Sequence, residues 1–274
     1  MIIDAHQHLW RPARGDYGWL ANAPASLQRE FGPADLAPLL TQTEVMRTIL
    51  VQAAPTAAET GFLLETARGT SFVAGVVGWA DLEAEAVGDH LAALMQNRGL
   101  VGVRPMIQDM ADPAWMLSRA PAAGFAALEA SGLRLDALVR PVHLAALAVL
   151  AQRHPRLAIV VDHLGKPDIG SGSFSAWAER LTHLARLPNV WVKLSGLLTE
   201  AGERRADVDL APYVGHALGV FGAERTMWGS DWPVLTLAGD YCGWFAQARR
   251  LTQALGQPAQ ERIFGGTASA FYGV

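Results

Sequence analysis

Cysteine is almost absent from this sequence, and so are long hydrophobic runs. Cys242 is the single cysteine among 274 residues, which excludes an internal disulfide and a thiolate metal cluster. No apolar run approaches the roughly 18 residues that a membrane-spanning helix needs. Asp4 and His6 interrupt the first apolar run, so no signal peptide is expected. These absences predict a cytoplasmic protein without membrane association.

Basic clusters are absent as well. The 22 Lys and Arg residues against 26 Asp and Glu give a formal charge of −4, without a basic block, so nucleic acid is not an expected partner. Hydrophobic residues make up 51% of the chain, enough for a large core. No low-complexity linker divides the sequence, which favours a single domain over residues 1–274. The oligomeric state stays open.

Eight short apolar runs recur along the chain, about 32 residues apart, the length of one βα unit. Mostly apolar runs of this kind are typical of parallel strands covered on both faces. They begin near Ile2, Arg47, Phe72, Leu100, Arg134, Ala158, Val190 and Thr226. Eight strands alternating with helices predict a (β/α)8 TIM barrel. The alternative, a doubly wound open sheet, usually carries a Gly-rich phosphate turn after its first strand, which is missing here.

Helical periodicity fills most of the intervals between these runs. The predicted helical stretches are Glu59 to Arg68, Glu85 to Asn97, Val142 to His154, Phe174 to Leu187, Leu210 to Phe221, Ala238 to Leu255 and Pro258 to Phe271. The first connection, about residues 10–35, is long for a βα loop and contains Trp10, Tyr17 and Trp19. It is either a wall over the active-site face or a surface loop that its aromatic residues anchor.

Polar residues stand where these predicted strands end, and a barrel gathers its active-site residues from that face. His6 and His8 project to one side of the first strand, where two imidazoles can bind a metal ion or a developing negative charge. His163 follows the sixth strand and Asp231 the eighth. Because strands one and eight are neighbours in a closed barrel, Asp231 is expected beside the two histidines. A carboxylate there stays ionised and can take a proton from water.

Four motifs combine in chain order: His6-Gln7-His8, Asp162-His163-Leu164-Gly165-Lys166-Pro167, Lys193-Leu194-Ser195-Gly196 and Gly229-Ser230-Asp231-Trp232-Pro233. In this combination the sequence resembles the amidohydrolase superfamily, in particular the amidohydrolase-related branch that contains sugar lactonases and pyrone-dicarboxylate lactonase. The resemblance implies a (β/α)8 barrel that hydrolyses a lactone. It also implies that Asp231 activates water, with His6, His8 and His163 gathered at the lactone carbonyl or at a metal ion.

The sequence departs from the two-metal members of that superfamily. Those members need a carboxylated lysine or a glutamate after strand four and a histidine after strand five, whereas this chain has Arg104 and Arg140 there. Arginine stays protonated and is a poor metal ligand, so no binuclear centre is expected. His6, His8, His163 and Asp231 suffice for one divalent ion, with zinc favoured, and equally for a metal-free site.

The expected partner is a small-molecule lactone, most simply an aldonolactone. Predicted substrate-binding residues are Arg104, Arg140, Gln108, Trp79, Lys166 and Trp10. Either arginine can instead pair with an aspartate such as Asp162, and the roles of Lys166 and Lys193 stay open between substrate binding and ion pairing.

Three alternatives remain. A pyrone- or muconate-type carboxylated lactone would change only the substrate. A zinc-dependent decarboxylase of the aminocarboxymuconate type would share the H-x-H pair and the late aspartate, but typically adds a histidine near strand five, which this chain lacks. A binding protein that has lost its chemistry is the third, and the intact His6, His8, His163 and Asp231 argue against it.

Overall fold

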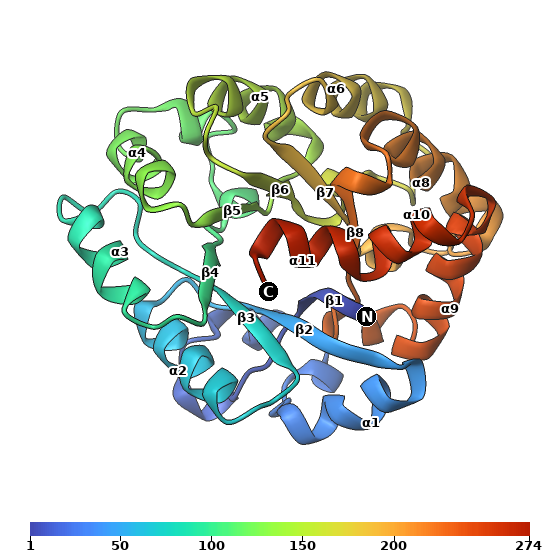
Figure 1. Cartoon of the computed structure of the whole chain (residues 1–274), viewed down its shortest axis with the longest axis horizontal. Helices are drawn as coiled ribbons and strands as arrows, with labels where there is room; N and C mark the ends of the chain where they lie inside the picture. The colour runs from blue at the N-terminus through green and yellow to red at the C-terminus, as the bar shows by residue number, and fades with distance from the viewer.

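An eight-stranded parallel sheet forms the centre of the computed structural model, which describes residues 1–274. Neighbouring strands follow one another in chain order around the sheet (Figure 1). They are β1 (Ile2–Gln7), β2 (Val45–Val51), β3 (Val73–Gly78), β4 (Leu100–Val103), β5 (Arg134–Ala137), β6 (Ile159–Val161), β7 (Val190–Leu194) and β8 (Thr226–Trp228). Each predicted strand begins within two residues of the observed one.

The sheet closes where the end of β1 meets the segment after β8. Gln7 and Trp232 form a parallel bridge. The backbone N–H of His8 donates to the carbonyl of Trp232 at 2.7 Å, and that of Asp231 donates to the carbonyl of His6 at 2.8 Å. The predicted (β/α)8 barrel is therefore confirmed.

Helices surround the barrel and complete a single domain (Figure 1). They are α1 (Pro33–Thr43), α2 (Ala57–Arg68), α3 (Val87–Met95), α4 (Ala122–Ser131), α5 (Leu144–Arg153), α6 (Ser175–Ala185), α7 (Leu197–Glu200), α8 (Asp207–Phe221), α9 (Tyr241–Thr252), α10 (Gln257–Glu261) and α11 (Thr267–Tyr272). All the predicted helical stretches contain a helix, and the last is interrupted by a π-type turn over Arg262–Gly266. The helices α1, α4 and α7 were not predicted. No helix is long and apolar enough to cross a lipid bilayer.

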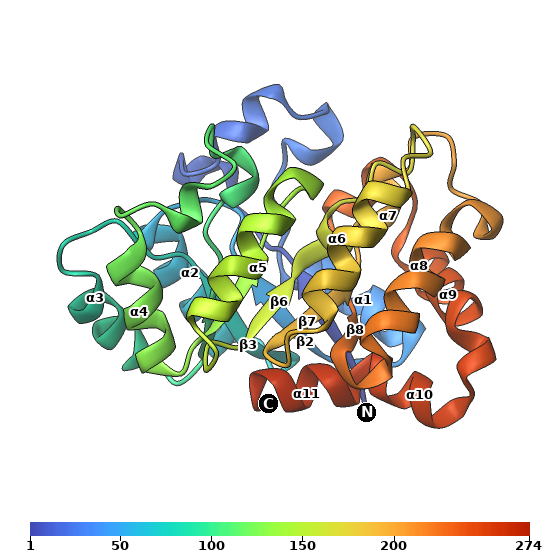
Figure 2. The same ribbon diagram turned by 90° about the horizontal axis from the view of Figure 1, so that it is seen from above.

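The two ends of the barrel are built differently. In Figure 2, α11 lies across the end where the strands begin, and the connection between β1 and α1 stands at the opposite end. Phe271 and Tyr272 of α11 pack against apolar side chains of the strands such as Ile3 and Met227, which closes the amino end. The carboxyl ends of the strands are left for the polar residues.

The β1–α1 connection consists of short 3-10 turns held by aromatic side chains. The turns are Pro12–Arg14, Gly18–Asn22 and Ala25–Leu27. The indole N–H of Trp10 donates to the carbonyls of Leu27 (3.2 Å) and Arg29 (2.9 Å), and its ring packs edge-on against Trp19 with centroids 5.2 Å apart. This segment is thereby fixed at the carboxyl end of the barrel.

Candidate active site

A cavity of about 270 Å³ opens at the carboxyl end of the barrel, and three of the four predicted catalytic residues line it. His8 comes from the end of β1, His163 from the turn after β6 and Asp231 from the segment after β8. The complete lining is His8, Trp10, Trp19, Ala53, Arg104, Met106, Gln108, Asp109, Leu138, His163, Lys166, Asp231 and Val234. His6, the fourth residue, is fully buried beneath it.

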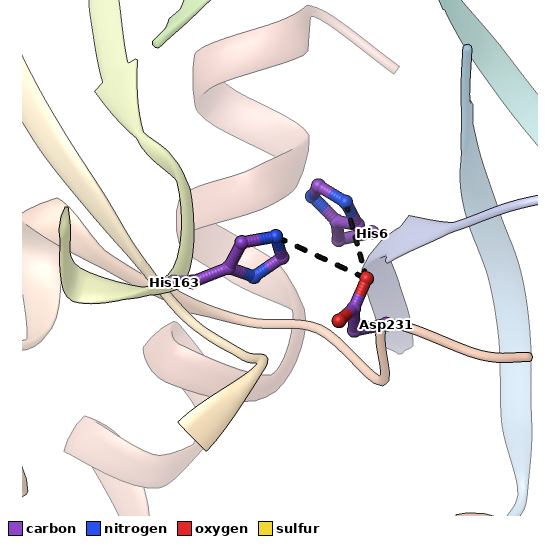
Figure 3. Close-up of side chains that lie close together, drawn as sticks. All are labelled: His6, His163 and Asp231. Carbon is purple, nitrogen blue, oxygen red and sulfur yellow. Dashed lines mark ion pairs between the residues drawn. The ribbon is translucent and has the colours of Figure 1, made fainter. Parts of the chain in front are cut away.

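Asp231 stands at the centre of the imidazoles. Its Oδ1 lies 3.3 Å from Nε2 of His8, 3.6 Å from Nε2 of His6 and 3.9 Å from Nε2 of His163. The two Nε2 atoms of His6 and His8 are 3.1 Å apart. Figure 3 shows His6, His163 and Asp231 pointing toward one another from three separate segments. The structure brings together all four residues that the sequence nominates for catalysis.

These donor atoms have the spacing that a zinc ion requires. Tetrahedral zinc with bonds of 2.0–2.2 Å separates its ligand atoms by roughly 3.3–3.6 Å. His6, His8 and Asp231 approach this with separations of 3.1, 3.3 and 3.6 Å. The ligand atoms of His6, His163 and Asp231 also lie within 4.8 Å of one another, and Asp231 forms ion pairs with no lysine or arginine. A buried group that can hold one divalent ion is therefore present, as the sequence predicted.

The Nδ1 atom of each imidazole, on the side of the ring away from Nε2 and Asp231, contacts a polar group that holds the ring in place. Nδ1 of His8 donates to the carbonyl of Val51 at 2.8 Å, which directs its Nε2 lone pair at the cavity. Nδ1 of His163 lies 2.9 Å from Oγ of Ser195. Nδ1 of His6 faces both a carboxylate oxygen of Asp162 (3.3 Å) and the ammonium of Lys193 (3.1 Å). The rings cannot turn without breaking these contacts, so the site is preorganised.

A buried ion cluster supports His6 from below. The ammonium of Lys193 lies 2.5 Å from Oδ2 of Asp136 and 3.2 Å from Oδ1 of Asp162, and all three side chains are fully buried. The hydroxyl of Tyr272 in α11 donates to the same oxygen of Asp136 at 2.8 Å. Lys193 is thus an ion-pairing residue in this structure. Tyr272 and Asp136 were not nominated from the sequence, since only tertiary packing brings them to His6.

Burial acts differently on the pKa of each member of this cluster. Burial raises the pKa of Asp136 to about 6, against the opposing charge of Lys193. Burial would also raise the pKa of Asp162, but Lys193 and His6 outweigh it and hold this pKa well below its usual range. Asp162 is therefore the ionised carboxylate beside His6.

Burial and neighbouring polar groups also compete in setting the protonation states of the residues at the cavity floor. Burial alone would raise the pKa of Asp231, but the surrounding histidines, His163 foremost, together lower it. Burial lowers the pKa of His163 to about 4, although Asp231 and Asp162 oppose the shift. Burial, reinforced by Lys193, also lowers the pKa of His6. At neutral pH the carboxylate of Asp231 is ionised and the imidazoles of His6 and His163 are neutral, the protonation state that metal binding and general-base catalysis both need.

The backbone at the site adopts a conformation that residues other than glycine rarely take. The φ angles are 60° at Asp231 and 55° at His163, both in the left-handed region. Gly196, with φ of 65°, passes so close to His163 that a Cβ atom would lie 2.5 Å from Nδ1 of the ring. Such strain is retained where the surrounding fold enforces it, and it clusters at functional sites.

Four predicted substrate-binding residues line the cavity: Trp10, Arg104, Gln108 and Lys166. Arg104 Nη1 lies 3.4 Å from Nε2 of His6 and 3.5 Å from Asp162, and its Nη2 donates to the carbonyl of Gln52. Lys166 pairs with Glu200 at 3.1 Å. Both cations therefore have an anionic partner inside the protein.

The other two predicted binding residues lie outside this lining. Arg140 is exposed at the start of the turn Pro141–His143, and the half-buried Trp79 is held through its carbonyl by Thr60. Their role stays a prediction. Conversely, Trp19 lines the cavity without having been nominated as a binding residue, although its place in the aromatic first connection was a usable signal.

Comparisons with known proteins show the family to which the chain is similar. The family model described as amidohydrolase matches residues 3–274. An L-fucono-1,5-lactonase of Burkholderia ambifaria is 46% identical, over 98% of this chain and 94% of that protein. An L-fucono-1,5-lactonase of Burkholderia multivorans is 36% identical, over 98% and 95%. A crystal structure of a Burkholderia multivorans amidohydrolase with bound zinc is 35% identical with a TM-score of 0.95, over 100% of this chain and 99% of that one.

Proposed function

We propose that this chain, which belongs to the amidohydrolase family, opens a sugar lactone to its hydroxy acid with Asp231 as the general base. The prediction of a lactone-hydrolysing enzyme of this family is confirmed by the two L-fucono-1,5-lactonases that it resembles over nearly its whole length. The observation that carries the assignment of the base is an ionised carboxylate at the cavity floor, surrounded by three imidazoles.

Asp231 accepts a proton from a water molecule in the cavity, and the resulting hydroxide attacks the lactone carbonyl. The carboxylate is held for this task, because Oδ1 is fixed among three imidazoles and the backbone N–H of Asp231 donates to His6. The proton then returns from Asp231 to the leaving alkoxide as the ring opens. Because the carboxylate is fixed, the water that it binds meets the lactone carbonyl in one orientation.

Negative charge develops on the carbonyl oxygen in the transition state, and the chain has groups to meet it. The guanidinium of Arg104 lines the cavity and reaches to 3.4 Å from Nε2 of His6. Fixed charges and dipoles in a water-poor site stabilise such an oxyanion strongly.

A zinc ion fits His6, His8 and Asp231, with His163 as a further ligand. When bound, it would supply Lewis-acid polarisation of the carbonyl and lower the pKa of water. Asp162, Ser195 and the carbonyl of Val51 would orient the histidine ligands.

The charges around the cavity favour an uncharged, hydroxyl-rich ring. Lys166 is paired with Glu200 and Arg104 with Asp162, and Asp109 adds an exposed negative charge to the lining. A carboxylated pyrone or muconate lactone would need an uncompensated cation, so it is the secondary candidate. Trp10 and Trp19 provide an apolar wall for the ring. A cytoplasmic location stays a prediction.

The decisive experiment is hydrolysis of a panel of aldonolactones, including L-fucono-1,5-lactone, beside carboxylated pyrone and muconate lactones. Proton release is followed with a pH indicator, and zinc content is measured before and after chelation. We expect kcat/KM for the preferred aldonolactone to exceed that for the carboxylated lactones by about 100-fold.

Two outcomes would overturn the proposal. A preference for carboxylated lactones would replace the substrate class. Release of carbon dioxide from aromatic acids, without hydrolysis of any lactone, would favour the decarboxylase alternative. Full activity after removal of all metal would keep the reaction and eliminate the zinc.

A further inference from the structure

Glu59 is a fully buried carboxylate that the proposed reaction does not use. It lies in the first turn of α2, and its two oxygens accept the backbone N–H groups of Ala53 and Ala54, each at 2.9 Å. These two residues belong to the short segment between β2 and α2. A buried carboxylate is costly unless it is hydrogen-bonded, so this one is committed to the shape of that segment.

That segment is part of the cavity wall. Ala53 lines the cavity, and its carbonyl accepts the indole N–H of Trp19 at 2.8 Å. Trp19 lines the cavity as well and packs edge-on against Trp10, with centroids 5.2 Å apart. A chain of contacts therefore leads from the carboxylate of Glu59 through Ala53 to both tryptophans.

A guanidinium and a hydroxyl face Glu59 from two other elements. Arg104 approaches from the end of β4, and the hydroxyl of Tyr17 approaches from the first connection, where Arg14 and Asp16 pair at 2.6 Å. Burial raises the pKa of Glu59 to about 7, although the two backbone N–H groups and Arg104 oppose the shift. Protonation turns one acceptor oxygen into a donor, and that oxygen then opposes a backbone N–H.

We propose that Glu59 is a positioning residue for substrate binding, which places Ala53, Trp19 and Trp10 against the lactone ring. Loss of the Glu59 carboxylate would displace these three residues in the cavity wall. The proposed catalytic residues at the cavity floor, such as Asp231, would stay in place. The inference rests on the proposed function only for its kinetic readout.

The test begins with Glu59→Gln, which keeps the volume of the side chain. Glutamine has a single acceptor oxygen, so one of the two backbone hydrogen bonds is lost. We expect KM for the preferred aldonolactone to rise roughly 3- to 10-fold, the cost of one hydrogen bond, with kcat within about twofold. Glu65→Gln is the matched control, because Glu65 is exposed on the same helix, and it should change neither constant.

A double variant separates this route from a general loss of structure. Trp19→Phe removes the indole donor to Ala53 and should raise KM similarly. Because both changes act through Ala53, the double variant Glu59→Gln/Trp19→Phe should raise KM no further than the larger single change. Multiplied effects would show that Glu59 and Trp19 act independently, and would overturn the proposal.

A measurement without substrate keeps the inference separable from the proposed function. The near-ultraviolet circular dichroism of the unmodified protein should change with a midpoint near pH 7, as the Trp10–Trp19 pair shifts, and Glu59→Gln should not show this change. KM of the unmodified protein should rise as the pH falls through the same range. A spectrum that is constant across this range would overturn the proposal even if no lactone were hydrolysed. Should Glu59→Gln fail to fold, Trp19→Phe and the pH dependence of the unmodified protein still decide.

Discussion

Oδ1 of Asp231 lies 3.3 Å from Nε2 of His8, although 223 positions separate the two residues in the chain. Each sits beside the seam where the segment after β8 meets the end of β1. The placement of Asp231 relative to the imidazoles is therefore a direct product of the closed barrel.

Asp231→Asn should reduce kcat about 10²- to 10⁴-fold, because the amide cannot accept a proton from water. The thermal midpoint should move little, since the amide is close in shape to the carboxylate. Initial rates on the preferred lactone and a thermal unfolding curve check both parts. Asp89→Asn, at an exposed position in α3, is the control and should leave kcat unchanged. Hydrolysis by Asp231→Asn at near the original rate would remove Asp231 as the base.

In the metal-free protein, buried His163 should contribute a loss of stability as the pH falls from about 6.5 to about 4, while Glu59 and Asp136, whose pKa values are raised, contribute in the opposite direction. His163 ordinarily titrates at 6.5, and burial lowers its pKa to about 4 in the folded protein. Between these values the unfolded chain binds a proton that the folded one does not, so unfolding is favoured progressively. His6 acts in the same direction. Urea unfolding at a series of pH values measures this dependence. His163→Gln should remove the His163 contribution from this pH dependence, and an unchanged dependence would contradict the assignment to His163.

Gly196→Ala should lower kcat/KM at least about tenfold. The added Cβ would lie 2.5 Å from Nδ1 of His163, and a φ of 65° is unfavourable for alanine. The ring must move, and small displacements of catalytic groups cost large factors in rate. Gly219→Ala in α8 is the matched control, because a Cβ atom there meets nothing within 4 Å. Equal kinetics for both variants would show that the position of His163 is unimportant.

Lys193→Met should destabilise the protein by about 3–5 kcal/mol, since it leaves the buried Asp136 without its cation and Asp162 with Arg104 alone. Lys166→Met breaks a pair whose members are 22% and 27% exposed, so it should cost less than about 1 kcal/mol. Chemical unfolding of the two variants compares these costs. A similar loss of unfolding free energy in both variants would mean that burial does not increase the contribution of the Lys193 ion pairs to stability.

The barrel could be predicted because its strands are short apolar runs at regular spacing. The helix α1 could not, since Pro38 lies inside it and the preceding connection is long. Its start is fixed by a carboxylate oxygen of Asp35 that accepts the N–H of Gly32 at 2.8 Å. The helix α4 is rich in alanine, and a run of small residues carries little periodicity.

The convergence of His6, His8, His163 and Asp231 could be predicted because strand-end positions in a barrel must meet at one end. The supporting residues could not, since their role depends on partners that only the packed fold supplies. Tyr272 reaches Asp136 from a helix at the opposite end of the barrel, and Glu59 acts on backbone groups that carry no sequence signal. Arg140 was placed correctly after β5, but the turn that follows carries it to the surface.

The bridge between Gln7 and Trp232 joins the first strand of the barrel to the segment that follows the last, and His6, His8 and Asp231 flank it. A partly folded molecule can have regained its helices and strands without this bridge. Until the bridge forms, Asp231 does not lie beside the imidazoles. The recovery of lactone hydrolysis during refolding should therefore lag behind the recovery of secondary structure. The rate of that recovery measures the last step of folding, in which the barrel closes.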